Sequence, residues 1–239
     1  MISEKAIVET EDIGLNVIIM EFSIVRKGSK IGDNVIIHPN VVIESGVIIE
    51  DNVEVFPGTY IGKVPKGAGA LARKPVFNEH VLIKKNCSIG PNAVIYYDVT
   101  IGEDTLIGDG ASIREKCVIG SKCIISRYVT INYEATVGDR TKIMDLSHIT
   151  GNSVIGNDVF ISLHVGSAND NAIGKEGYDH ERIMGPRIND GAVIGLGASL
   201  LPNITIGKDS IVGAGAVVTK DVLDGATVMG VPAKVIKSN

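Results

Sequence analysis

The sequence has few of the bulky residues that usually fill a globular core: aromatic residues make up 4% of its 239 positions, and tryptophan is absent. It contains no run of about 18 apolar residues, which excludes a membrane-spanning helix. With 23 Lys and Arg against 28 Asp and Glu, the net charge is −5. The basic stripe typical of nucleic-acid binders is therefore missing, and we expect small-molecule partners, with neither nucleic acid nor membrane among them.

Cysteine is also scarce, with three in the chain. An odd, small number does not fit a disulfide framework and indicates a reducing compartment. The first twelve residues, MISEKAIVETED, carry acidic side chains and lack the apolar stretch of a secretory signal. We therefore expect a cytoplasmic protein.

Glycine, in contrast, is abundant, and aliphatic residues recur at every sixth position. Steps of six from Ile7 meet an aliphatic residue each time over 7–61, and the pattern restarts over 83–161 and 188–218. Glycine often follows the aliphatic residue directly, and Asp, Asn or Pro comes next. A small or β-branched residue stands four positions after the aliphatic one. Gly, Asn and Asp tolerate left-handed turns, and alternation places the aliphatic and the small residue on one inward face. The repeat predicts short strands joined by tight turns.

Parallel strands stacked in this way form a solenoid, in which each coil buries its inner face against its neighbours. The pattern over 7–61, 83–165 and 188–222 resembles the hexapeptide-repeat family, whose units build a left-handed parallel β-helix with three hexads in each triangular coil. About thirty hexads then give roughly ten coils, or roughly 45–50 Å at the usual strand spacing. We predict an all-β, left-handed parallel β-helix that spans residues 1–239 as a single domain.

The small inward position of the hexad accounts for the cysteines. Cys87, Cys117 and Cys123 all fall there, where Ala, Thr or Val stands in other repeats. We expect all three to be buried structural residues.

Three segments leave the repeat: a first insertion at 62–82, a second at 166–187 and a C-terminal tail at 223–239. Long loops in compact proteins are functional or disordered, so each insertion is either a mobile corner loop or part of a site. In the functional interpretation, the first insertion offers cations such as Lys63 and Arg73 to phosphates. The second insertion then closes over a substrate.

Residues 18 positions apart are expected to stack in outward columns. One such column is apolar at its centre: Ser88, Leu106, Ile124, Lys142 and Phe160. A neighbouring column becomes polar toward the second insertion: Val94, Ser112, Thr130 and His148. An apolar outer stripe is normally buried against a partner, closed oligomers are common, and the family resemblance implies a homotrimer packed along one face.

The same resemblance implies acyl transfer from acetyl-CoA or another short acyl-CoA, with no metal. The Gly- and Ala-rich third block is similar to the stretch along which these enzymes lay the pantetheine arm, and Gly230–Lys234 is similar to their tail motif. Lys220 and Lys234 are candidate phosphate partners. The candidate cofactor contacts are Gly195, Ala198, Gly213, Ala216, Lys220, Pro232 and Lys234.

A closer resemblance is to sugar-nucleotide N-acyltransferases, which acylate an amino group on a nucleotide-linked sugar. It depends on the second insertion, the Asn169–Asp170 pair and the tail. The resemblance implies that Asn169, Asp170 and Asn171 hydrogen-bond the sugar. Related acetyltransferases place a catalytic histidine after an asparagine in this loop, whereas this sequence has Asp170 there.

Amide formation requires a neutral amine, a proton acceptor and donors for the developing oxyanion, for which a backbone amide of a Gly-rich turn is available. Histidine is the natural base near neutral pH. His148 and His164 flank the departure of the chain into the second insertion, and Asp145 is close enough in sequence to orient His148. The candidate bases are His148, His164 and Asp170; otherwise the departing thiolate takes the proton.

Other functions stay open. The acceptor is alternatively an amino acid or another small amine. A zinc lyase of the carbonic-anhydrase type would need three converging histidines, but the nearest such pair, His148 and His164, is offset around the prism. A solenoid without catalysis is the remaining alternative, although two polar insertions and a CoA-like third block argue against it.

Overall fold

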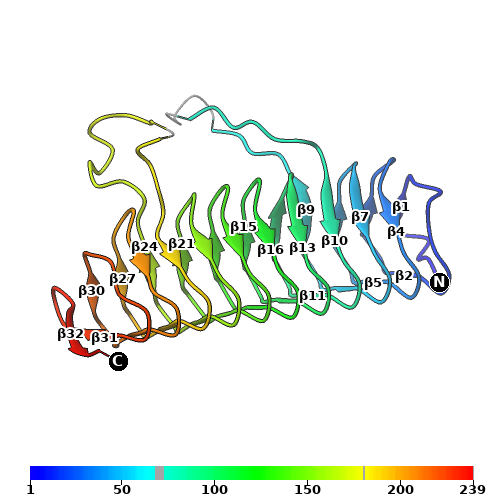
Figure 1. Ribbon diagram of the computed structural model, residues 1–239. Coiled ribbons are helices and arrows are strands. Elements are labelled where there is room, and N and C mark those ends of the chain that lie inside the picture. The colour runs from blue at the N-terminus through cyan, green and yellow to red at the C-terminus, as the bar shows by residue number, and fades with distance from the viewer. Residues whose placement is uncertain (68–72, 180, 239) are drawn as a thin grey trace.

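The computed structural model describes residues 1–67, 73–179 and 181–238, which form a three-sided prism of short parallel strands (Figure 1). The chain visits the three faces in turn and then begins the next coil, so from β2 to β30 strands three apart in chain order are hydrogen-bonded neighbours. No helix occurs in the described part of the chain. The prediction of an all-β, left-handed parallel β-helix is confirmed.

The strands are assigned to three faces. Face 1 contains β1 (Ile7–Val8), β3 (Ile24–Val25), β6 (Val42–Ile43), β9 (Tyr60–Lys63), β12 (Val94–Tyr96), β15 (Ser112–Ile113), β18 (Thr130–Ile131), β21 (His148–Ile149), β24 (Gly166–Ser167), β27 (Ser199–Leu200) and β30 (Val217–Val218). Face 2 contains β4 (Lys30–Ile31), β7 (Val47–Ile49), β10 (Val81–Ile83), β13 (Val99–Ile101), β16 (Val118–Ile119), β19 (Thr136–Val137), β22 (Val154–Ile155), β25 (Arg187–Ile188) and β28 (Thr205–Ile206). Face 3 contains β2 (Ile18–Ile19), β5 (Ile36–Ile37), β8 (Glu54–Val55), β11 (Ser88–Ile89), β14 (Leu106–Ile107), β17 (Ile124–Ile125), β20 (Lys142–Ile143), β23 (Phe160–Ile161), β26 (Val193–Ile194), β29 (Ile211–Val212), β31 (Thr227–Met229) and β32 (Lys234–Lys237).

The strand register confirms both outward columns. Ser88 pairs with Leu106 on face 3, and Thr130 pairs with His148 on face 1. The described strands form sheets of 11, 9 and 12 members, so two of the three faces have slightly more strands than the ten coils expected. The sequence pattern missed the last turns because the coil that ends at Val228 is two residues short of the period, Val228 pairing with Val212.

The core is a continuous stack of the inward aliphatic residues, and most of the isoleucines in it have no exposed surface. A fully buried side chain of this size stabilises the fold by about 1.5–3 kcal/mol. Cys87, Cys117 and Cys123 are buried among them as free thiols, as predicted. Burial raises the pKa of Cys117 to about 12, so this thiol is inert at neutral pH.

The turns explain the residues that follow each strand. A Cβ at Gly102 would lie 2.5 Å from the backbone of Gly120 in the next coil, so only glycine fits there. Asn52 has a left-handed backbone (φ 58°), which asparagine tolerates well. Its side chain also accepts from Asn34 and donates to Asn86, at 3.1 and 3.2 Å. These bonds form part of an amide ladder that links successive coils along one edge.

Two details differ from the hexad pattern. Ile7 was expected to point inward, but Val8 pairs with Val25 and Ile7 is 52% exposed. The first coil is one residue short of the period, and a one-residue shift reverses which side chains face the core. In the tail, β31 continues face 3, and β32 turns back antiparallel to it.

Candidate functional site

Both insertions leave the prism at the same edge, between face 1 and face 2. Strands extend into the ends of both predicted insertions. The first insertion therefore lies between β9 and β10 (residues 64–80 rather than 62–82), and the second lies between β24 and β25 (residues 168–186 rather than 166–187). They project from this edge toward each other (Figure 1). Four strands of face 1, from β12 to β21, separate their points of departure. The corner residues of the intervening coils therefore form the floor between the insertions.

That floor is a column of residues spaced by 18: Tyr97, Glu115, Tyr133 and Gly151. Phe77 of the first insertion stacks on Tyr97 at a centroid distance of 6.1 Å. Arg73 of the same insertion donates to Glu115 and lies over the Tyr133 ring, 3.8 Å from its centroid. Tyr133 also meets Tyr178 of the second insertion edge to face, at 6.5 Å. The two insertions thus join over one corner column.

Glu115 is the buried centre of this junction, with no exposed side-chain surface. Besides the bond from Arg73, its carboxylate accepts bonds of 3.0 and 3.1 Å from Nε and Nη2 of Arg114. A buried carboxylate is tolerated only with such partners. Sequence reasoning missed Glu115, Tyr133 and Tyr178. A usable signal was present, because Tyr97, Glu115 and Tyr133 share a corner column in a protein with few large side chains.

The predicted first-insertion cations are both engaged with the protein. Arg73 has 13% of its side-chain surface exposed. Lys63 Nζ lies 2.6 Å from the Tyr96 hydroxyl and 4.2 Å from the centroid of that ring. Lys63 is thus close to the junction, while Arg73 is part of it.

Asp170 organises the second insertion. Its carboxylate accepts 2.8 Å bonds from the backbone amides of Ala172 and Gly174 and pairs with Arg182 Nη1 at 2.8 Å. The bond from the Gly174 amide, followed by that from Ala172, lowers the pKa of Asp170. These bonds favour a structural role, because a carboxylate stabilised in its charged form is a poor proton acceptor.

Asn169 lies against the floor column. Its Nδ2 donates to the Gly151 carbonyl at 3.2 Å and lies 3.4 Å from the Tyr133 hydroxyl. The other end of the insertion is held by Asn152, whose Nδ2 donates to the Ile183 carbonyl at 2.7 Å. The second insertion is therefore fastened to the prism at both of its ends.

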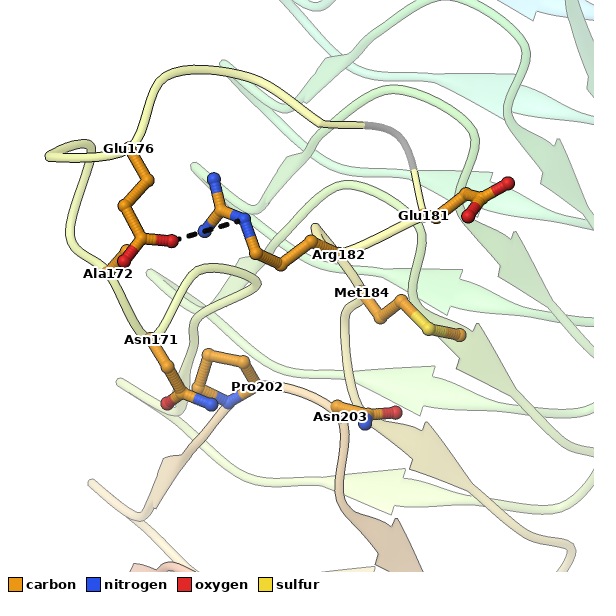
Figure 2. Close-up of a pocket in the computed structure, with 8 residues that line it drawn as sticks. All are labelled: Asn171, Ala172, Glu176, Glu181, Arg182, Met184, Pro202 and Asn203. Atoms are coloured by element: carbon orange, nitrogen blue, oxygen red, sulfur yellow. Dashed lines mark ion pairs between the residues drawn. The ribbon is translucent and has the colours of Figure 1, made fainter.

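A cavity of about 450 Å³ opens between the second insertion and the next coil of the prism (Figure 2). Arg182 and Glu176 form an ion pair at its rim, with Nε and Oε2 3.7 Å apart. Pro202 and Asn203 of the next coil form the base of this cavity. The lining residues are Asn171, Ala172, Glu176, Glu181, Arg182, Met184, Pro202 and Asn203. Of the predicted acceptor contacts, Asn171 lines this cavity.

His148 lies on face 1, one coil before the second insertion. Its Nδ1 is 2.7 Å from Thr130 Oγ1, and burial lowers the pKa of the ring below its ordinary value. The next residue in its outward column is Gly166. A Cβ built on Gly166 would meet no atom within 4 Å, so the glycine leaves open space beside the imidazole.

Asp145 and His164 lie at a different edge, between face 3 and face 1. Asp145 binds the Ser126 hydroxyl and the Arg127 guanidinium. The bond from Ser126, followed by that from Arg127, lowers its pKa. His164 is an exposed turn residue with a φ of 58°. Thr130 rather than Asp145 therefore contacts the His148 ring.

The predicted cofactor stretch has a packing explanation. Ala198 and Ala216 are fully buried and point into the core. A Cβ at Gly195 would lie 2.5 Å from the amide nitrogen of Ala214 in the next coil. A Cβ at Gly213 would lie 2.8 Å from the Cβ of Met229. Three further candidates are exposed near the C-terminal end: Lys220, Pro232 and Lys234.

The described residues contain no group of three or more His, Cys, Asp or Glu side chains that could hold a metal ion. Within the same residues, no helix is long and apolar enough to cross a membrane.

Family models match three parts of the chain. A model described as the GMPPB C-terminal domain matches residues 77–170. A model described as bacterial transferase hexapeptide (six repeats) matches residues 13–45, 28–63 and 185–220.

Curated relatives match a shorter region. Serine acetyltransferase of Bacillus pumilus is 50% identical over 54 residues, 23% of this chain and 25% of that protein. The 2,3,4,5-tetrahydropyridine-2,6-dicarboxylate N-acetyltransferase of Staphylococcus aureus is 54% identical over 50 residues, 21% of each chain. The chain thus spans a quarter or less of these relatives' length.

Solved structures match nearly the whole chain at low identity. A UDP-N-acetylglucosamine acyltransferase of Arabidopsis has a TM-score of 0.57 at 17% identity, with 98% of this chain and 73% of that chain covered. The Bacteroides fragilis protein of the same description has a TM-score of 0.55 at 20% identity, with the same coverage. These likenesses show the fold. Together with the repeat and the family models, they show that the chain is built of hexapeptide repeats wound into a β-helix.

Proposed function

We propose that the protein is an acyl-CoA-dependent N-acyltransferase that acetylates the amino group of a nucleotide-linked amino sugar. The observation that carries this proposal is the position of His148, a half-buried histidine beside open space and one coil from the second insertion. The names of the curated relatives support acyl transfer. The names of the fold relatives support a nucleotide-linked sugar as acceptor.

His148 is suited to act as the base. Burial favours its neutral form, and with the Nδ1 proton donated to Thr130 Oγ1, Nε2 carries the lone pair. Among the described residues, Nε2 has no hydrogen-bond partner. The amine nitrogen attacks the thioester carbonyl, the C–N bond forms, and the C–S bond breaks. The proton lost from nitrogen passes to Nε2 and then to the departing thiolate.

Gly166 supplies the room for this reaction. A reacting carbonyl must come within about 3–3.5 Å of the attacking amine while the base stays in reach. The outward position next to His148 has no side chain to prevent that approach. The structure itself does not require this glycine, because no neighbouring atom would clash with a Cβ there. A role in substrate access explains it better than packing does.

The second insertion is the proposed acceptor-binding segment. Asn171 and Arg182 border the cavity of Figure 2 and offer an amide and a cation to a sugar or its phosphates. Asn169 holds the start of the insertion against Gly151. Lys220 and Lys234 stay candidate partners for the phosphates of CoA.

A homotrimer is part of the proposal. The outward column of face 3 exposes 41% of Leu106, 36% of Phe160, 37% of Val193 and 45% of Ile211. A stripe of this kind is suited to burial against a second copy. A cytoplasmic location also stays a proposal.

The test is a thiol-release assay with acetyl-CoA across UDP-, dTDP- and GDP-linked amino sugars, with serine and tetrahydrodipicolinate as the small-acceptor arm. We expect turnover with at least one nucleotide-linked amine, and a loss of about 10²-fold or more in His148→Gln. His38→Gln, which removes a histidine on an early coil, should retain activity. Turnover with serine or tetrahydrodipicolinate alone would show that the acceptor is a small amine and not a nucleotide-linked sugar. Wild-type activity in His148→Gln would exclude His148 as the base.

A further inference from the structure

The two insertions are in contact although four strands of face 1 lie between their points of departure. The contact runs from Glu115 through Arg73 and Tyr133 to Tyr178. The insertions project from one edge toward each other (Figure 1). We propose that the first insertion is a brace for the second, and that Arg73 and Glu115 are positioning residues for the proposed acceptor site.

Arg73 can join the insertions because a guanidinium has two separate modes of contact. Its N–H groups donate in the plane of the group, here to Glu115, while its flat face lies over the Tyr133 ring at 3.8 Å. A lysine ammonium lacks the planar face and has one point of charge. The chemistry of the junction therefore requires arginine at position 73.

Tyr133 transmits the contact to the second insertion. Its ring lies against Gly151, where a Cβ would come within 2.7 Å of the ring carbons. Any larger residue at 151 would displace the ring. From this position Tyr133 meets the Tyr178 ring, and its hydroxyl lies 3.4 Å from Asn169 Nδ2. The start and the middle of the second insertion thus depend on where this one ring lies.

Glu115 fixes Arg73 without depending on it for folding. The carboxylate keeps two bonds from Arg114 of its own coil when Arg73 is removed. Substitution of Arg73 therefore leaves no unpaired buried charge, which is the usual cause of a collapsed core. This makes Arg73→Met the informative variant, whereas Glu115→Ala would leave the half-buried Arg114 side chain without its carboxylate partner.

Hydrogen–deuterium exchange measures the brace without reference to activity. The amides of Lys175 and Ile183 are bonded within the second insertion, to the carbonyls of Ala172 and Asp179. In Arg73→Met we expect both amides to exchange about tenfold faster, while amides of the central coils stay protected. Lys74→Met removes the adjacent exposed cation and should leave both rates unchanged. Wild-type exchange in Arg73→Met would overturn the proposal.

The coupling must also operate in the opposite direction, since linkage between two sites is reciprocal. Tyr178→Ala should accelerate exchange at the amide of His80, which is bonded to the Asn78 carbonyl in the first insertion. An unchanged rate at His80 would contradict a shared junction.

The catalytic consequence depends on the proposed function. Arg73→Met should raise the KM for the acceptor about tenfold and leave the KM for acetyl-CoA unchanged, and Arg73→Lys should recover only part of the loss. An equal loss with both substrates would refute a positioning role. If no acceptor is found at all, the exchange measurement still decides whether the brace exists.

Discussion

The His148 ring is held by a residue of the preceding coil: Thr130 Oγ1 lies 2.7 Å from Nδ1 in the outward column of face 1. The sequence places the two residues 18 positions apart, so the contact follows from the coil length. The proposed reaction uses the tautomer in which Nδ1–H donates this bond to Thr130 Oγ1 and Nε2 carries the lone pair that accepts a proton. Thr130 is thereby a positioning residue for the base.

Thr130→Val tests this role, because valine keeps the shape of the side chain and removes its oxygen. Loss of one hydrogen bond of about 1.4 kcal/mol lowers kcat about tenfold. Thr130→Ser retains the oxygen and should retain most activity. Equal rates for the valine and serine variants would show that the bond has no part in turnover.

The pH dependence of kcat/KM follows from the lowered pKa of His148. The neutral ring is the active form, so activity falls as the pH drops through a value below the ordinary 6.5. The same shift means that the unfolded chain takes up this proton more readily. The contribution of His148 to stability is therefore complete above pH 6.5 and lost below it. A pH profile whose acid limb lies above pH 6.5 would contradict this assignment.

Two glycines of the prism should respond oppositely to alanine. Gly102→Ala places a Cβ 2.5 Å from backbone atoms of the next coil and should destabilise the fold by about 1–3 kcal/mol. Gly166→Ala meets no atom within 4 Å, so its Tm should not fall, but turnover should drop because the added methyl lies beside His148. Denaturation and the thiol-release assay separate the two effects. A lowered Tm in Gly166→Ala would indicate a packing role instead.

The amide ladder should contribute measurably to stability. Asn52→Leu removes the bonds to Asn34 and Asn86 and places a γ-branched apolar residue at a φ of 58°, which together cost about 2 kcal/mol. The matched control is Lys122→Leu, at the same column position with the same φ. Lysine already bears the left-handed strain, so this change should stay within about 0.5 kcal/mol. Urea denaturation of the two variants measures the difference.

The fold could be predicted from the sequence because its rules are local. Apart from Ile183 in the second insertion and Ile204, every buried isoleucine falls on the period of six, and each turn is specified by residues within a few positions. The prediction was wrong at Ile7, where the first coil is one residue short of the period. Nothing in a hexad count signals such a one-residue shift.

The candidate site could be predicted only in part, because its contacts join distant positions. His148 was proposed as the base from its place next to the second insertion, and Thr130 was already in its column. The partnership of Arg73 with Glu115 and Tyr133 links residues 42 and 60 positions apart, and no local pattern specifies it. The outward columns contained the missing information, since a solenoid turns an 18-residue spacing into physical contact.

The junction between the insertions sets a limit on how this gene can change. Coils add or drop out of a solenoid with little harm to its core, since each contacts only its neighbours. A whole coil gained between β9 and β24 would move the insertions apart by about 4.8 Å and would break either the contact of Arg73 with Tyr133 or that of Tyr133 with Tyr178. Duplicated coils are therefore tolerated before β9 or after β25, whereas the number of coils between the two insertions is fixed.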